Sequence, residues 1–204
     1  MLKFFFIKQT IYNIVSTKDV LLLQEMETRI IKINVDTIRN KLVSMKAIKV
    51  KEENQINNIY DFPDGKLLKN KGYARIRVVH DNLKNITTNY MTVKKLLSQE
   101  KYKVMEENET LIEDANEGSL IFTSLGLELV QSIKKYRESY KYKNSLIEID
   151  INDESFCPFP YIEIESQNEN EIKEIVELLG YNMNDTTSKT IFEILNNEGT
   201  IKGL

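Results

Sequence analysis

Apolar and polar residues alternate along most of this chain, and a period of two is typical of β-strands with one buried face. Eight stretches follow this pattern strongly enough to predict strands. They cover residues 21–33, 47–60, 73–80, 88–96, 102–112, 127–140, 145–152 and 160–166. Several of these predicted strands follow one another without a helix between them, so they must pair antiparallel.

Helices are predicted where apolar residues recur every three or four positions between the strands. Asn34 and Asp36 can cap a short helix that ends near Met45, while Gly126 and Gly180 close two others. The remaining helices fit residues 114–125, 171–179 and 187–195. Strands in one sheet with helices outside it predict an α+β fold.

The ends of the chain differ from its middle. No clear period starts before Leu21, so we expect residues 1–20 to form an N-terminal extension. Residues 21–197 are then one domain, and residues 198–204 are a short tail.

Charged residues occupy alternate positions in most of the predicted strands, which places them on one face of each strand. One such pair is ordinary for a face that meets water. Here, however, acidic and basic pairs lie on different strands, and like charges side by side repel each other. The residues are Glu25, Glu27 and Arg29; Arg75 and Arg77; Lys94; Glu107 and Glu109; Lys135 and Arg137; Glu148 and Asp150; Glu163 and Glu165.

A closed barrel explains this distribution of charge. About eight antiparallel strands enclose a lumen that can hold one small ligand, with charged faces inward and apolar faces under the helices. Arg and Lys bind phosphate oxygens, and carboxylates bind Mg²⁺ or Mn²⁺. We therefore predict an eight-stranded antiparallel β-barrel whose charged lumen binds a polyanion together with a divalent metal.

Composition narrows the class of protein. With 28 Lys and Arg against 31 Asp and Glu, the net charge is −3, and the basic residues form no continuous stripe, which argues against nucleic acid as a partner. No apolar run has the roughly 18 residues of a membrane span, and no secretory signal is recognisable. One cysteine and one histidine exclude an internal disulfide and the usual zinc sites. We expect a cytoplasmic protein.

At the alternating charges the chain resembles the CYTH superfamily, the triphosphate tunnel metalloenzymes. Members include class IV adenylate cyclases, thiamine triphosphatases and inorganic triphosphatases. The family has an ExExK motif on its first strand, and Glu25-Met26-Glu27-Thr28-Arg29 stands in that place. The resemblance covers residues 21–182, and residues 185–195 resemble the closing helix of the family. Its further motifs are Tyr60-Asp61-Phe62-Pro63-Asp64-Gly65, Arg75-Ile76-Arg77, Thr92-Val93-Lys94, Glu107-Asn108-Glu109, Lys135-Tyr136-Arg137, Glu148-Ile149-Asp150 and Glu163-Ile164-Glu165.

This resemblance implies a role for each charged position. The metal-binding carboxylates would be Glu25, Glu27, Glu148, Glu163 and Glu165, with Asp150 as a further candidate. The triphosphate would bind Arg29, Arg75, Arg77, Lys94, Lys135 and Arg137, of which Arg29, Lys94 and Arg137 are the catalytic candidates. Glu107 and Glu109 match an acidic pair in the middle of the family's barrel.

Two positions depart from the family pattern. Arg29 replaces the lysine of the motif, and an arginine stays protonated, so we expect it to contact substrate without acting as a base. Ile59 stands where thiamine triphosphatases have a tyrosine thought to assist catalysis, which argues against that activity.

The resemblance implies a metal-dependent enzyme that acts on a triphosphate, with Mg²⁺ or Mn²⁺ as cofactor. A class IV adenylate cyclase, which converts ATP to cyclic AMP and pyrophosphate, is the first interpretation, because the short chain and residues 60–65 resemble that branch. The alternatives are hydrolysis of tripolyphosphate, a nucleoside triphosphate or thiamine triphosphate, and a non-catalytic polyphosphate or nucleotide binder. A homodimer would be compatible with such a barrel.

Overall fold

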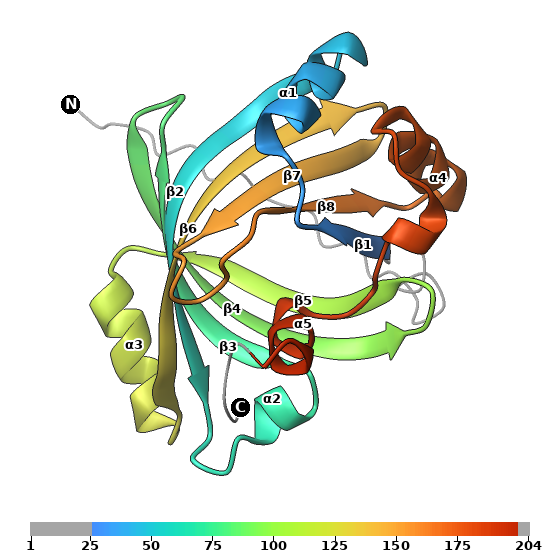
Figure 1. Ribbon diagram of the computed structural model, residues 1–204. Helices are drawn as coiled ribbons and strands as arrows, with labels where there is room; N and C mark the ends of the chain where they lie inside the picture. Colours follow the sequence, from blue (N-terminus) through green and yellow to red (C-terminus); the bar gives the residue numbers. More distant parts are fainter. Residues whose placement is uncertain (1–25, 200–204) are drawn as a thin grey trace, which may run out of the picture.

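The fold is a closed antiparallel barrel of eight strands, as a computed structural model that describes residues 26–199 shows (Figure 1). The α+β barrel predicted from the alternation is confirmed. Around the barrel the strands follow the order β1-β5-β4-β3-β2-β6-β7-β8, and β1 meets β5 through the pair Glu27–Lys103. The predicted extension 1–20, Glu25 and residues 200–204 lie outside the described residues. The strands are β1 (Met26–Ile31), β2 (Ile48–Asp61), β3 (Tyr73–Asp81), β4 (Ile86–Gln99), β5 (Lys103–Ile112), β6 (Glu128–Tyr142), β7 (Ser145–Asn152) and β8 (Tyr161–Ser166).

Five α-helices and one 3₁₀ turn accompany the barrel in the described part of the chain. They are α1 (Val35–Ser44), α2 (Lys66–Lys69), α3 (Ala115–Ser124), α4 (Glu169–Leu178), η2 (Met183–Asp185) and α5 (Ile191–Asn197). As expected, the Asn34 side chain caps α1 by accepting a hydrogen bond from the Thr37 amide at 2.9 Å. No helix within residues 26–199 has the length and apolar character needed to cross a membrane.

The last helix begins later than the sequence pattern predicts. Residues 187–190 are not helical, because their backbone is attached to β1: the amides of Arg29 and Thr187 each donate to the other's carbonyl at 2.9 Å. The short segments α2 and η2 were not predicted, since neither is long enough to show a helical period.

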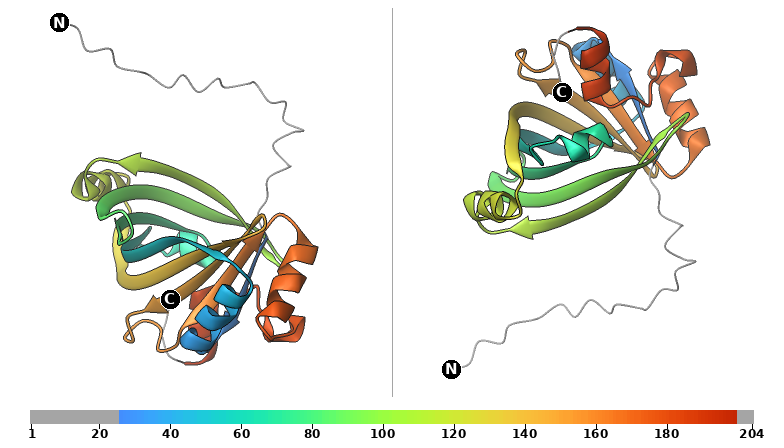
Figure 2. Two further views of the ribbon diagram at one scale, coloured as in Figure 1. Left: turned by 90° about the horizontal axis from the view of Figure 1, so that it is seen from above. Right: turned by 90° about the horizontal axis from the view of Figure 1, so that it is seen from below.

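Apolar side chains on the outside of β1, β7 and β8 pack beneath two helices. Figure 2 shows α1 and α4 lying side by side on one side of the barrel, with α3 on the opposite side. Isoleucines that alternate with the charged residues, such as Ile149 and Ile164, are fully buried against Leu42 of α1 and Ile175 of α4. Burial of these side chains from water fixes the apolar faces outward and so turns the alternate, charged faces into the lumen.

Helix α3 covers the outside of β3 and β4. Phe122 packs on Ile76 in a separate buried cluster. Gly118 allows this close approach, because a Cβ atom there would lie 2.5 Å from the Ile112 Cδ1 atom and 2.9 Å from that of Ile76.

One carboxylate is buried outside the lumen, between β6 and α1. Glu138 accepts hydrogen bonds from Arg39 at 2.6 Å, from the Tyr136 hydroxyl at 2.9 Å and from the Tyr140 hydroxyl at 2.6 Å. Burial opposes its ionisation, but these donors and nearby Lys49 outweigh that effect and hold its pKa at about 2. Glu138 therefore ties α1 to the barrel as an ion.

The Glu138→Gln substitution should lower the free energy of unfolding at pH 7 by about 2 kcal/mol, because hydrogen bonds to a buried charge are lost. With a folded pKa of about 2 against an ordinary 4.5, this stabilisation is present above pH 4.5 and is lost as the pH falls towards 2. Urea unfolding of both proteins at pH 7 and pH 4 measures the difference. A difference that stays constant with pH, or that equals the effect of Gln at the exposed Glu113, would contradict this role.

Candidate functional site

The lumen contains a cavity of about 540 Å³ whose wall carries charged side chains from six strands. The cavity reaches from the acidic residues of β8 to α2 and α5 at one end of the barrel. Its charged wall includes Glu27, Arg29, Arg75, Arg77, Lys94, Lys103, Lys135, Arg137, Glu163 and Glu165. Most of the candidate residues named from the sequence therefore face one space.

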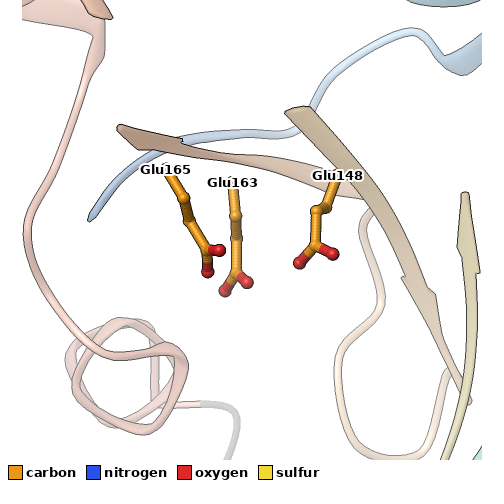
Figure 3. A group of neighbouring side chains, drawn as sticks. All are labelled: Glu148, Glu163 and Glu165. Carbon is orange, nitrogen blue, oxygen red and sulfur yellow. The ribbon is translucent and has the colours of Figure 1, made fainter. Parts of the chain in front are cut away.

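Three carboxylates converge at one side of this space. Figure 3 shows Glu163 and Glu165 extending from β8 towards Glu148 of β7. Each of the three offers a carboxylate oxygen, and these oxygens lie within 4.8 Å of one another. We call Glu148, Glu163 and Glu165 the carboxylate cluster.

The members of the carboxylate cluster differ in how their charge is balanced. Burial opposes the ionisation of Glu163, but Arg29 and Arg137 hold its pKa well below the usual range. Glu165 makes no ion pair with any described residue; burial, together with Glu148, Glu27 and Glu163, raises its pKa to about 8. The cluster thus has more acidic groups than the surrounding cations neutralise.

This imbalance fits a divalent cation. Mg²⁺ and Mn²⁺ prefer oxygen ligands, and a cation among the three carboxylates would remove the repulsion that raises the pKa of Glu165. Glu148, Glu163 and Glu165 are the residues that could hold it. Glu27 lies on the same cavity wall, but its carboxylate already pairs with Arg29 and with Lys103, the latter at 2.7 Å.

Asp150 is engaged by basic residues and does not line the cavity. It has no exposed surface, and it accepts hydrogen bonds from Arg137 Nε and Nη2, both at 2.6 Å, and from Lys135 Nζ at 2.9 Å. Arg137 also pairs with Glu148 and with Glu163. In this arrangement, Asp150 holds the two basic side chains at the cavity wall.

A second basic group lies across the cavity on β3 and β4. Glu109 accepts from Arg77 at 2.9 Å and from Arg75 at 3.4 Å, while Lys94 pairs with Glu107 at 2.7 Å. The Nε atoms of Arg75 and Arg77 are buried and have no hydrogen-bond partner among the described residues. Such donors suit an anion, because guanidinium groups bind phosphate through several N–H groups at once.

Arg29 is tied to its neighbours on several sides. Its Nε donates to Glu163 at 2.7 Å, its Nη1 donates to the Lys189 carbonyl at 2.7 Å, and the guanidinium also pairs with Glu27. Arg29 therefore links the acidic side of the lumen to the segment that precedes α5.

Sequence reasoning missed two residues of the cavity wall. Lys103 is buried and pairs with Glu27, and Tyr73 lies directly opposite Lys94 on the neighbouring strand. The alternation contained a signal for Lys103, because it shares the face of Glu107 and Glu109 at even spacing. Tyr73 likewise shares the face of Arg75 and Arg77. An uncharged residue, however, carries no such signal.

Comparisons with known proteins agree with this geometry. The family model of the CYTH domain matches residues 23–191. A search of the curated proteins finds no match.

Solved structures with the same fold cover most of the chain. A conserved hypothetical protein from Pyrococcus furiosus is 25% identical with a TM-score of 0.68, covering 83% of this chain and 98% of its own. A candidate adenylate cyclase from Vibrio parahaemolyticus is 16% identical with a TM-score of 0.67, covering 85% and 98%. HpAC1 from Hippeastrum, a candidate adenylyl cyclase described as having a dominant triphosphatase activity, is 16% identical with a TM-score of 0.64, covering 86% and 96%. The last two likenesses concern the fold alone.

Gln at position 165 should stabilise the metal-free protein and abolish its response to Mn²⁺. The native state holds a proton on Glu165 between pH 4.5 and about 8, so the stability of the wild type falls as the pH rises through this interval. Glu165→Gln should remove that fall. Mn²⁺ should raise the melting temperature of the wild type by mass action but leave that of the variant unchanged.

Thermal unfolding at pH 6 and pH 8.5, with and without Mn²⁺, tests both effects. Glu113→Gln is the matched control on an exposed carboxylate and should behave as the wild type. An undiminished Mn²⁺ response in Glu165→Gln would count against the carboxylate cluster as the metal site.

Proposed function

The chain belongs to the CYTH domain family, and from this premise we propose that it is a divalent-metal-dependent enzyme that acts on a triphosphate in its lumen. One observation carries the proposal: the carboxylate cluster, with its surplus of acid, and two groups of basic residues face each other across one cavity. A pure anion binder would gain nothing from three converging carboxylates. An enzyme that binds a metal and a triphosphate together needs both.

The roles of the residues follow from their contacts. Arg75, Arg77 and Lys94 would bind phosphate oxygens from β3 and β4, and Lys135 and Arg137 would bind them from β6. The cation held by the carboxylate cluster, when bound, would neutralise phosphate charge and polarise the phosphorus that is attacked.

A proton must also leave the attacking hydroxyl or water. Arg29 cannot accept it, because an arginine stays protonated. The carboxylates of the lumen can, and Glu165, whose pKa is raised to about 8, can hold a proton near neutral pH.

For the reaction itself, we propose the class IV adenylate cyclase activity first. The ribose 3′-oxygen of ATP would attack the α-phosphorus, and pyrophosphate would leave, giving cyclic AMP. Hydrolysis of a triphosphate by water is the second candidate. It is favoured by the dominant triphosphatase activity described for HpAC1, whose fold this chain shares.

Phosphorus NMR of the products from purified protein with Mg²⁺ or Mn²⁺ separates these reactions. ATP and tripolyphosphate are supplied in separate samples. Cyclic AMP with pyrophosphate identifies the cyclase, whereas orthophosphate identifies the hydrolase. No metal-dependent turnover of either compound would contradict the proposed function.

Two adjacent lysines on β4 provide a matched pair of variants. Lys94 faces the lumen, and Lys95 lies on the outer face, with 60% of its side chain exposed. Lys94→Ala should reduce kcat/KM by about 100-fold, since a charge that stabilises the transferring phosphate is lost. Lys95→Ala should leave it unchanged. Equal effects of the two substitutions would exclude Lys94 from substrate binding.

We further propose a cytoplasmic location, consistent with a single cysteine that is buried in the described structure. A homodimer stays a prediction.

A further inference from the structure

The cavity changes character towards the end that α2 and α5 flank. Figure 1 shows these two helices at the same end of the barrel. There the cavity wall is apolar and largely aromatic, and it belongs to one of the hydrophobic clusters of the molecule. We call this part the apolar end; its residues are Ile59, Ile133, Phe156, Tyr161 and Phe192.

The rim of the apolar end exposes further apolar side chains. Phe62 and Leu68 reach it from the α2 region, and Leu129 reaches it from the start of β6. Leu129 keeps 55% of its surface exposed although it lines a cavity. Exposed apolar surface at the mouth of a cavity is typical of a site that buries part of a ligand.

An inorganic polyphosphate does not use this wall. Its oxygens are charged along the whole molecule, and contact with apolar side chains would remove their hydration without replacing it. The charged part of the cavity, around Arg75, Arg137 and the carboxylate cluster, is the part that matches such an anion. The apolar end needs a different chemical group attached to the same ligand.

We propose that the substrate is a nucleoside triphosphate, with its heteroaromatic ring in the apolar end and its phosphates in the charged part. This inference rests on the proposed function and specifies its substrate class. Flat rings pack favourably on aromatic side chains such as Phe156 and Phe192, which themselves meet edge to face with centroids 5.5 Å apart. Thr190, Asn196 and Glu128 on the same cavity wall supply the few polar groups that orient a ring.

The test compares ATP with tripolyphosphate in the wild type and in Leu129→Gln. Leu129 is partly exposed, so a polar replacement there leaves the buried cores intact. The ratio of kcat/KM for ATP to kcat/KM for tripolyphosphate should exceed one in the wild type and fall about tenfold in Leu129→Gln, because the ring loses apolar contact. Leu125→Gln is the control: Leu125 is 66% exposed and does not line the cavity.

Each outcome has a separate meaning. Turnover of tripolyphosphate in preference to ATP, or a ratio that Leu129→Gln leaves unchanged, overturns this inference and leaves the proposed function standing. Absence of turnover with both compounds contradicts the proposed function. In that case calorimetric titration with ATP and with tripolyphosphate still decides the inference, because Leu129→Gln must weaken the binding of ATP more than that of tripolyphosphate.

Discussion

The structure depends on mutual neutralisation of charge inside a closed barrel. Every strand has an apolar and a polar face, and helices α1, α3 and α4 can cover only the outer one. The inner face then buries many ions, which is costly unless each is paired. Arg137, which meets Glu148, Asp150 and Glu163 at once, is the centre of that pairing. The fold is stable because the lumen carries both signs of charge in alternating strands.

The same pairing prepares the cavity for a ligand. Acids such as Glu109 and Asp150 hold the basic side chains in place without a substrate, so little rotamer freedom is left for binding to remove. Glu165 is the exception, since no described residue balances its charge, and it marks where the lumen accepts a cation. Arg29 connects this acidic side to the backbone before α5, and α5 in turn provides part of the apolar end. Metal site, phosphate site and ring site are therefore built on one connected framework.

The sequence predicted the strands and the direction of their charged faces, because a period of two determines both. It also identified most of the cavity wall through the spacing of like charges, including Arg75 with Arg77 and Glu163 with Glu165. It could not indicate that Asp150 is occupied by Lys135 and Arg137, since that depends on which strands become neighbours. The apolar end was missed for the same reason. Its members come from four strands or loops and α5, and each alone has the pattern of an ordinary core residue.

The most direct test of the central claim is a crystal structure of the protein with Mn²⁺ and a non-hydrolysable ATP analogue, with the metal located by its anomalous signal. The account predicts a Mn²⁺ ion in contact with carboxylates of Glu148, Glu163 and Glu165. It also predicts phosphates between the basic residues of β3, β4 and β6. A Mn²⁺ ion bound elsewhere, or an analogue bound outside the barrel, would contradict it.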